Sequence, residues 1–448
     1  MRSIDELVRA DLGLVSREVF SSEELFQQEL STIFARAWLM VGHESLIPKP
    51  DDYFVSRMGA DSVILTRDRQ GQIHVLLNSC MHRGMKLCRY DSGNNRTFSC
   101  SYHGWSFSTD GKLVEAPGGL VGVPGYDTFY NKELDKSKWG LRRVAQVANY
   151  KGTIWATWDP NAPSFLNYLG GMRIYLDSLL DHRDGREGGS EVVGGIQKWR
   201  VKCNWKFPPE NFIGDKHHDI SHRSADLAGV GPSPGKGRRD LTTKRMCVVF
   251  PDLGHGTMAR LPHTEEYDHT PQYKGVPVLE EYFEHVYQER VKNLGDKLRV
   301  TPHATSTIFP NMSFHALQPR SIGLFHPISP TETEIWRMYL VDADSPPEVK
   351  AATQHYNISY HGPAGMAESD DMENWSCATE SCVSPQARLL DFNYQMGIGH
   401  VEKAPYLDDA VYADYSEEGA RAYYRQWGRF MKGLAWSELR PDVKEPQR

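Results

Sequence analysis

The chain has 448 residues, of which 40% are hydrophobic and 24% are charged, and its formal net charge is −7 at pH 7. This composition is typical of a globular protein of roughly two or three domains, and the negative charge argues against nucleic acid as a partner. No apolar run approaches the roughly 18 residues that cross a membrane. Charged side chains interrupt the first 20 residues, and seven thinly spread cysteines do not form a secreted disulfide framework. We therefore expect a cytoplasmic protein that binds neither membranes nor nucleic acid.

The first part of the chain predicts one helix followed by short strands. A capping-box pattern at residues 21–24 and apolar residues at helical spacing predict a helix over residues 22–38. Pairs of strand-like runs joined by polar turns follow, and they predict β-hairpins. These runs are 63–66 with 73–77, 105–107 before the turn at Asp110-Gly111, and 144–147 with 153–158. The break at Asp159-Pro160 marks the expected domain boundary.

The second part mixes helical and strand-like patterns. A helix is predicted over 164–180, an exposed loop over 181–195, and a last helix from residue 416, with strands between them at 243–251, 306–313 and 334–342. Such a mixture predicts an α+β domain with helices packed on an antiparallel sheet. A glycine-rich stretch at 229–237 lacks the Ser or Thr of a phosphate loop, so we do not expect NADH to bind this chain.

Two cysteines and two histidines are spaced as a metal site. Cys80-Met81-His82 is followed, after seventeen residues, by Cys100-Ser101-Tyr102-His103. Two thiolates and two imidazoles can bind zinc in a closed tetrahedron, or divide over a 2Fe–2S cluster with the cysteines on one iron and the histidines on the other. The spacing alone leaves both alternatives open.

The residues around these pairs favour the iron–sulfur cluster. With Arg83-Gly84 after the first pair and Gly104-Trp105 after the second, the stretch resembles the Rieske segment of the large (α) subunit of aromatic-ring-hydroxylating dioxygenases. The resemblance implies a Rieske cluster bound by Cys80, His82, Cys100 and His103. A zinc ribbon remains the disfavoured alternative.

A second group of residues predicts a mononuclear metal site. If their segment is helical, His218 and His222 lie four positions apart on one face and can bind the same ion. Two histidines and one carboxylate, with open positions left over, form the facial triad of non-haem iron(II) oxygenases. The carboxylate must come from elsewhere in the chain.

The resemblance suggests which carboxylate this is. Family members carry Asp-x-x-His before a second histidine, here Asp215, His218 and His222, and a Gly-Pro-Ala-Gly segment before an acidic pair, here Asp370-Asp371. Asp371 matches the family's ligand, and Asp370 is the alternative. Because family members usually have one more residue between their histidines, His217 is an alternative to His218.

The resemblance also implies how the two sites cooperate. In a ring-shaped trimer, Asp215 would bridge the cluster ligand His103 of one subunit to His218 of the next, with Asn211 beside it as a second catalytic residue. A carboxylate that accepts a hydrogen bond from a metal-bound imidazole orients the ring. The implied reaction inserts both atoms of O₂ into an aromatic ring to give a cis-dihydrodiol. Electrons would come from NADH through a reductase, a ferredoxin or both.

Four residues are expected to line the substrate pocket: Phe212, His361, Met366 and Ala367. Apolar walls favour an apolar ring, and the small Ala367 stands where some relatives place a bulky aromatic residue, which favours polycyclic or biphenyl-type hydrocarbons. His361 is the polar residue among these four, so hydroxylated or carboxylated aromatics are alternative substrates.

The expected domains are an N-terminal helical segment over residues 1–40 that packs on the catalytic domain, an all-β Rieske domain over 41–160, and a catalytic iron domain over 161–448. Expected partners include a small β subunit, in an assembly of α and β trimers, or else an α-only trimer. Two alternative functions remain open. One is a Rieske monooxygenase, such as a salicylate hydroxylase or a demethylase; the other is an electron-transfer protein with a vestigial second site.

Overall fold

A computed structural model of the chain describes residues 2–114, 122–228, 246–259, 272–295, 304–405 and 407–440. The chain divides into two compact units: Ala35–Ala162 forms the smaller, and Met1–Phe34 together with Pro163–Arg448 forms the larger. Among the described helices, none has the length and apolar character needed to cross a membrane. The glycine-rich stretch at 229–237 lies outside the described residues.

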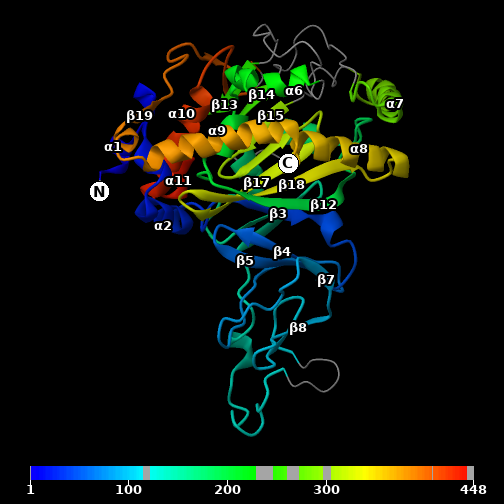
Figure 1. The fold of residues 1–448 in the computed structure, drawn as a ribbon. Helices are drawn as coiled ribbons and strands as arrows, with labels where there is room; N and C mark the ends of the chain where they lie inside the picture. The colour runs from blue at the N-terminus through cyan, green and yellow to red at the C-terminus, as the bar shows by residue number, and fades with distance from the viewer. Residues whose placement is uncertain are drawn as a thin grey trace. The chain divides into compact units, whose positions relative to one another are not determined.

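The smaller unit is built of short antiparallel strands (Figure 1). They form a four-stranded sheet in the order β6-β5-β4-β7, a three-stranded sheet in the order β10-β11-β3, and the β8-β9 hairpin. The strands are β3 (Leu39–His43), β4 (Asp52–Met58), β5 (Asp61–Arg67), β6 (Ile73–Leu77), β7 (Ser92–Asn94), β8 (Thr97–Ser99), β9 (Ser106–Ser108), β10 (Gln146–Tyr150) and β11 (Thr153–Thr157), with 3-10 turns η3 (Glu44–Leu46) and η4 (Lys136–Lys138). The predicted hairpins of residues 63–77 and 144–158 are confirmed as β5–β6 and β10–β11. At the predicted turn Asp110-Gly111 the chain makes only a bridge from Phe107 to Leu113, because β9 pairs with the preceding β8.

The core of this unit lies directly beneath the cysteine–histidine loops. Ile64, Leu76 and Phe107 are fully buried and belong to the same apolar cluster as Cys80 and Cys100. Apolar side chains from facing strands thus form a rigid base for the two loops.

The larger unit contains a nine-stranded antiparallel sheet in the order β12-β18-β17-β16-β15-β14-β13-β21-β20. Its strands are β12 (Ser190–Val201), β13 (Met246–Phe250), β14 (His255–Ala259), β15 (Ala304–Ile308), β16 (Met312–His315), β17 (Ser321–Ser329), β18 (Glu332–Asp342), β20 (Glu402–Lys403) and β21 (Val411–Ala413). Helices cover it (Figure 1): α8 packs on β12 and β18, and α10 packs on β13 and β14. The predicted α+β class, with helices on an antiparallel sheet, is confirmed.

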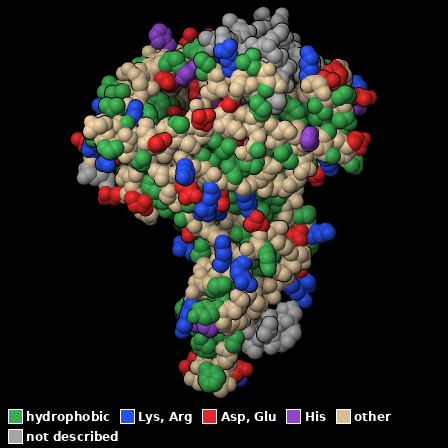
Figure 2. All heavy atoms as spheres, in the orientation of Figure 1, with side chains coloured by type: hydrophobic (Ala, Val, Ile, Leu, Met, Phe, Trp, Pro, Cys, Tyr) green, Lys and Arg blue, Asp and Glu red, His purple; other side chains and the backbone are tan. Residues whose placement is uncertain are grey.

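After the N-terminal segment, the described helices of the larger unit are α3 (Phe165–Leu169), α4 (Arg173–Leu180), α5 (Phe207–Phe212), α6 (Arg223–Leu227), α7 (Pro277–Leu294), α8 (Pro347–His361), α9 (Met366–Val383), α10 (Glu418–Met431) and α11 (Trp436–Leu439), with 3-10 turns η5 (Gly170–Met172), η6 (Lys216–Ile220) and η8 (Ala387–Leu389). Figure 2 shows positive, negative and apolar side chains interspersed over the visible face of this unit. A mixed surface of this kind agrees with the modest net charge of −7.

The N-terminal residues belong to the larger unit. They form α1 (Ile4–Leu7), β1 (Val8–Arg9), η1 (Ala10–Leu12), β2 (Leu14–Ser16), η2 (Arg17–Phe20) and α2 (Glu23–Thr32), and β2 pairs with β19 (Asp391–Asn393). Glu29 of α2 accepts hydrogen bonds from Lys206 Nζ at 2.6 Å and from the indoles of Trp205 and Trp427 at 2.7 Å. Because this carboxylate is buried and fully partnered, it fixes α2 to the segment that leads into the candidate iron site.

Four predicted elements differ from the structure. The helix predicted over 22–38 ends at Thr32, because the apolar residues that follow, such as Phe34 and Trp38, are buried in the core instead of extending a helical face. The helix predicted over 164–180 is broken at Gly170, whose φ of +55° is left-handed, and the Gly171 N–H donates to Asp409 at 2.7 Å.

The predicted loop over 181–195 is wrong beyond residue 189, because β12 begins at Ser190 opposite Asp342 of β18. The strand predicted over 306–313 is two strands, β15 and β16, which turn back on each other.

Candidate metal centres and active site

The two cysteine–histidine loops have the same backbone design. In the first, the Cys80 N–H donates to the Met85 carbonyl at 2.8 Å, and the Gly84 N–H donates to the Cys80 carbonyl at 2.8 Å. The second loop repeats both bonds, from the Cys100 N–H to the Trp105 carbonyl at 2.8 Å and from the Gly104 N–H to the Cys100 carbonyl at 2.9 Å. Each loop therefore holds its cysteine in a closed turn.

The side chains of these loops converge on a common centre. The rings of His82 and His103 lie 4.7 Å apart, and Trp105 stacks on His82 at 5.1 Å. The buried Nδ1 atoms of both histidines have no hydrogen-bond partner among the described residues. Partial burial and the neighbouring His103 lower the pKa of His82, which favours the neutral imidazole that binds metal. With the buried Cys80 and Cys100 thiols, this donor set fits a Rieske cluster.

The second site is assembled from separate segments of the larger unit. His218 lies in η6, His222 follows in the turn before α6, and Asp371 lies in α9. The helix assumed for the histidine segment is therefore not continuous. The segment that carries the two histidines is preceded by a break at Gly214, with φ +117°, where an added Cβ would lie 2.6 Å from Cys247 Sγ. The two imidazole rings still lie 5.0 Å apart.

The donor atoms of these residues face one another. His218 Nε2 lies 2.7 Å and His222 Nε2 lies 3.5 Å from Asp371 Oδ1, and all three donor atoms lie within 4.8 Å of one another. Two imidazoles and one carboxylate that converge in this way fit a non-haem iron, and three protein donors leave coordination positions for other ligands.

The alternative ligands point elsewhere. His217 Nδ1 lies 2.9 Å from Asp215 Oδ1. The Asp370 carboxylate accepts a hydrogen bond from the Ser224 hydroxyl at 3.0 Å and lies 3.5 Å from His222 Nδ1, the ring nitrogen that faces away from the donor centre. The structure therefore brings together His218, His222 and Asp371.

Asn211 and Asp215 lie on either side of the His218 ring. Asn211 Nδ2 is 3.2 Å from His218 Nε2, and Asp215 Oδ2 is 3.9 Å from His218 Nδ1. Asp215 therefore lies behind the ring relative to the donor atoms, where a carboxylate can orient a metal-bound imidazole. A hydrogen bond with Asp215 raises the pKa of the adjacent His217.

The residues expected to line the pocket include three buried side chains: Phe212, His361 and Ala367. Met366 is partly buried at the start of α9. His315 of β16, which the sequence analysis missed, connects two of them: its ring lies 5.1 Å from Phe212 and 4.7 Å from His361. No sequence signal marks His315, because it lies in a strand about a hundred positions from Phe212.

Comparison with known proteins places the chain. Residues 37–124 match the Rieske [2Fe-2S] domain family, and residues 167–433 match the catalytic domain of the ring hydroxylating alpha subunit. Biphenyl dioxygenase subunit alpha of Paraburkholderia xenovorans (strain LB400) is 35% identical, over 98% of this chain and 95% of the relative. The chain belongs to the ring-hydroxylating dioxygenase α-subunit family.

Solved structures agree with this assignment. Naphthalene 1,2-dioxygenase with indole bound in the active site superposes with a TM-score of 0.86 at 31% identity, covering 98% of this chain and 97% of that one. The quaternary ammonium Rieske monooxygenase CntA shares the fold, with a TM-score of 0.67 at 15% identity over 96% of this chain and 99% of that one.

The family resemblance predicted from the sequence is thus confirmed. This α subunit is the terminal oxygenase component of a multicomponent system, and it receives electrons that originate in NADH through ferredoxin or reductase partners. Its cofactors are a Rieske cluster and a mononuclear iron.

A buried ion pair supports α9 beneath the triad. Arg337 of β18 donates to both oxygens of Glu368 at 2.6 and 2.8 Å, and both side chains are 0% exposed. Glu368 lies one turn before Asp371, and the Arg337 guanidinium lies 5.6 Å from the Phe212 ring. The pair therefore holds the first turns of α9 against the sheet and contacts the pocket wall, and sequence patterns gave no sign of it.

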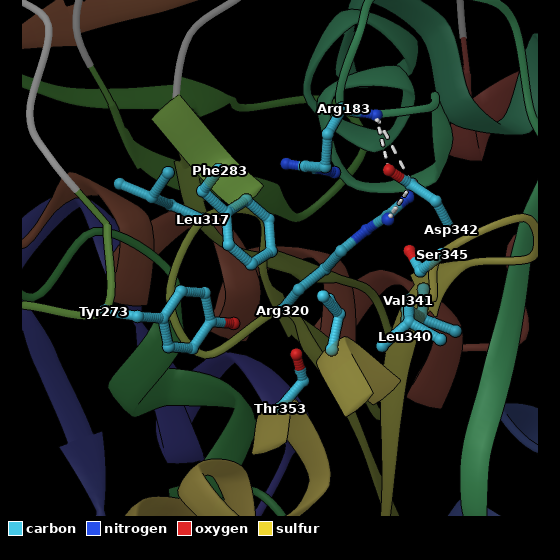
Figure 3. Close-up of a pocket in the computed structure, with 11 residues that line it drawn as sticks. Arg183, Tyr273, Phe283, Leu317, Arg320, Leu340, Val341, Asp342, Ser345 and Thr353 are labelled. Carbon is cyan, nitrogen blue, oxygen red and sulfur yellow. Dashed lines mark hydrogen bonds and ion pairs between the residues drawn. The ribbon is translucent and has the colours of Figure 1, made fainter. Parts of the chain in front are cut away.

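A separate cavity in the α subunit is lined by arginines with structural roles (Figure 3). Arg320 Nη1 and the Arg183 backbone N–H both donate to Asp342, and the Arg183 guanidinium also donates to carbonyls at the end of α4. Burial, reinforced by nearby Arg320, lowers the pKa of Arg183 to about 9. Because their guanidiniums bond to backbone carbonyls and to Asp342, Arg183 and Arg320 cap α4 and fix it to β18.

Proposed function

We propose that this α subunit dioxygenates an apolar aromatic hydrocarbon of the biphenyl or fused-ring type to a cis-dihydrodiol. The observation that carries the proposal is the convergence of the donor atoms of His218, His222 and Asp371 within 4.8 Å. Ala367, one turn before Asp371 in α9, and Phe212, which follows the Asn211 that lies beside His218, are both buried. A ferrous iron held by these three protein donors would supply open coordination positions for O₂ activation. The relatives named for biphenyl and naphthalene support the choice of substrate.

We assign the residues as follows. Cys80, His82, Cys100 and His103 bind the cluster, and His218, His222 and Asp371 bind the iron. Phe212, Met366 and Ala367 hold the substrate ring by apolar contact, and His361 orients its edge. Apolar walls around few polar groups are typical of such pockets.

We assign the electron route to Asp215. Its position behind the His218 ring, with Oδ2 at 3.9 Å from Nδ1, supports a carboxylate that orients the imidazole and links it to His103 of a neighbouring subunit. Asn211, 3.2 Å from His218 Nε2 on the other side, limits the tilt of the ring. We further propose a trimeric assembly, with or without a small β subunit, in the cytoplasm.

The test combines the purified protein with a ferredoxin–reductase pair, NADH, naphthalene or biphenyl, and ¹⁸O₂. The expected product is a cis-dihydrodiol with both oxygen atoms labelled. A singly labelled phenol would contradict dioxygenation and favour the monooxygenase alternative.

The electron route has its own test, the variant Asp215→Asn. We expect this variant to retain both metal centres, measured as iron and acid-labile sulfide, but to lose turnover, since the amide lacks the charge that orients the imidazole. Substantial turnover in Asp215→Asn would overturn the assigned route while leaving the reaction itself intact.

A further inference from the structure

Two histidines meet at the wall of the proposed substrate pocket. The rings of His315 on β16 and His361 at the end of α8 lie 4.7 Å apart, and the His315 ring lies 5.1 Å from the ring of Phe212. Phe212 follows Asn211, whose Nδ2 lies 3.2 Å from Nε2 of the candidate iron ligand His218. A pair of imidazoles thus lies next to the aromatic residue that leads to the iron site.

The register of the sheet places His315 in a row of polar side chains. Thr305 of β15 pairs with His315, and His315 pairs with Ser321 of β17. Ser321 in turn pairs with Tyr339 of β18. Directly paired residues of an antiparallel sheet project from the same face. Four adjacent strands therefore present hydrogen-bonding groups on the face that carries His315, although a hydrocarbon substrate offers such groups no partner.

Hydroxyl groups of this row lie beside one nitrogen of each imidazole. Thr305 Oγ1 lies 3.1 Å from Nδ1 of His315, and Ser321 Oγ lies 3.5 Å from Nδ1 of His361. Ser321 and His361 are buried, and His315 is partly buried. The second ring nitrogen of an imidazole, Nε2, donates or accepts a hydrogen bond according to the tautomer. The pair can therefore offer a substrate group both a donor and an acceptor.

The charge near the pair decides which substrate group fits it. Arg337, whose guanidinium lies 5.6 Å from the Phe212 ring, donates to both oxygens of Glu368, so its charge is already compensated. A carboxylate buried without a cation of its own is strongly destabilised. A hydroxyl group is neutral, and it both donates and accepts hydrogen bonds. The pair therefore suits a hydroxyl substituent better than a carboxylate.

We propose that His315 and His361 are specificity-determining residues that bind a hydroxyl substituent of the aromatic substrate. This inference rests on the proposed dioxygenation, and it narrows the substrate class from the parent hydrocarbon to a monohydroxylated biphenyl or fused-ring compound. Phe212 and Ala367 contact the apolar rings of this substrate, and the two histidines hold its hydroxyl group. A site built to hydrogen-bond a substrate hydroxyl discriminates against the analogue that lacks it.

The first test is equilibrium binding, which requires no electrons. Calorimetry measures the Kd of the oxidised holoenzyme for biphenyl and for each monohydroxylated biphenyl isomer. We expect at least one isomer to bind roughly tenfold more tightly than biphenyl, which is the effect of one good hydrogen bond. Equal or weaker binding of every hydroxylated isomer would overturn the inference, and so would tighter binding of a biphenyl carboxylic acid than of any hydroxybiphenyl.

Substitutions of the two histidines test the hydrogen bonds separately from the shape of the pocket. The quantity compared is the ratio of the Kd for biphenyl to the Kd for the tightest hydroxybiphenyl. His315→Leu removes both ring nitrogens, so this ratio should fall roughly tenfold, and it should also fall in His361→Phe. His315→Gln retains an amide group that can donate and accept, so most of the ratio should remain. A wild-type ratio in both His315→Leu and His361→Phe would show that the histidines do not determine specificity.

The matched control is His326→Leu. His326 lies on β17, five positions after Ser321, and successive side chains of a strand alternate between the two faces of a sheet. His326 therefore projects from the opposite face, and its variant should keep the wild-type ratio. A fall as large as that in His315→Leu would show that any histidine of this sheet affects binding, and the assignment to the pair would be wrong.

Turnover separates this inference from the proposed function. With NADH, the electron-transfer partners and ¹⁸O₂, the wild type should convert the preferred hydroxybiphenyl to a cis-dihydrodiol with both new oxygen atoms labelled. A singly labelled product would refute the proposed dioxygenation, whatever the ratio of the binding constants. A doubly labelled product formed from biphenyl with a higher kcat/KM than from any hydroxybiphenyl would refute only the inference.

Discussion

The two candidate metal centres are constructed in opposite ways. The cluster residues all lie within residues 80–103, on two loops that each close through their own backbone hydrogen bonds. The candidate iron ligands His218 and Asp371 are separated by 153 positions and meet only because α9 packs beside η6. One centre is thus defined by a short stretch of chain, and the other by the tertiary packing of the larger unit.

This difference predicts different vulnerabilities. A local site depends on the conformation of its own loops, and distant substitutions leave it unchanged. An assembled site depends on every contact that positions its elements, including the buried Arg337–Glu368 pair under α9. Three predictions test this contrast and a fourth tests the acid sensitivity of the larger unit; they run from the largest expected effect to the smallest.

The largest effect is expected at the end of α9 that carries the carboxylate. Asp371→Ala should lose the mononuclear iron and all oxygenation while keeping the cluster, because two histidines alone form an incomplete facial triad. Iron and sulfide analysis, with the visible spectrum of the cluster, measures both centres in the same sample. Asp370→Ala is the matched control and should retain most of the iron, because Asp370 faces the Ser224 hydroxyl and Nδ1 of His222, 3.5 Å away, instead of the donor nitrogens. Iron loss in Asp370→Ala instead would reverse the ligand assignment.

A smaller effect is expected when the support of α9 is removed. Glu368→Gln leaves the fully buried Arg337 without its counter-charge, which costs about 3–5 kcal/mol of stability. Thermal unfolding should show this loss, and iron content should fall more than cluster content. The exposed pair Arg200–Glu332 provides the control, since Glu332→Gln should change stability by less than about 1 kcal/mol. Equal loss of both metals in Glu368→Gln would contradict the contrast between the centres.

The same contrast explains what could be predicted from sequence. Spacing alone located the cluster loops, and the structure brings Cys80, His82, Cys100 and His103 to one unit as that spacing requires. The hairpins around them were predicted because turn residues and alternating strands are local signals. The Asp371 carboxylate was found only through family resemblance, because no local pattern connects it to His218.

Other parts of the site could not be predicted, for the same physical reason. His315 contacts Phe212 and His361 across the sheet, and Arg337 meets Glu368 between a strand and a helix. Each contact is set by tertiary packing, which overrides local propensity. The broken helix at Gly170 was missed as well, because its left-handed φ depends on how Asp409 binds the next backbone N–H.

Acid should destabilise the larger unit through His255. Its Nε2–H donates to the Tyr168 carbonyl at 2.9 Å, its Nδ1 accepts from the Phe309 N–H at 3.0 Å, and burial lowers its pKa to about 3. The unfolded chain binds this proton near pH 6.5, so the unfolded state holds more protons between about pH 6.5 and 3, and stability falls as pH falls across that window. At pH 5 the loss is about 2 kcal/mol.

The measurement is the free energy of unfolding from pH 7 to pH 4, followed by tryptophan fluorescence. His255→Leu should be less stable at pH 7, because two backbone groups lose their partner. The slope of its unfolding free energy against pH should be smaller than the wild-type slope by the equivalent of nearly one bound proton. An unchanged slope would show that acid acts on the larger unit through other groups.

The smallest effect compares the two cluster loops with each other. Gly84 and Gly104 both adopt left-handed backbone conformations, with φ of +71° and +75°, so alanine at either position costs roughly 1–2 kcal/mol. An alanine Cβ at Gly104 would also lie 3.0 Å from Pro124 Cγ, whereas at Gly84 the nearest atom is Ser79 Oγ at 3.8 Å. Gly104→Ala should therefore lower cluster content and thermal stability more than Gly84→Ala, with the mononuclear iron unchanged in both. If either variant lost the mononuclear iron, strain in one turn would have reached residues more than a hundred positions away in the sequence. The cluster loops would then not be an independent local site.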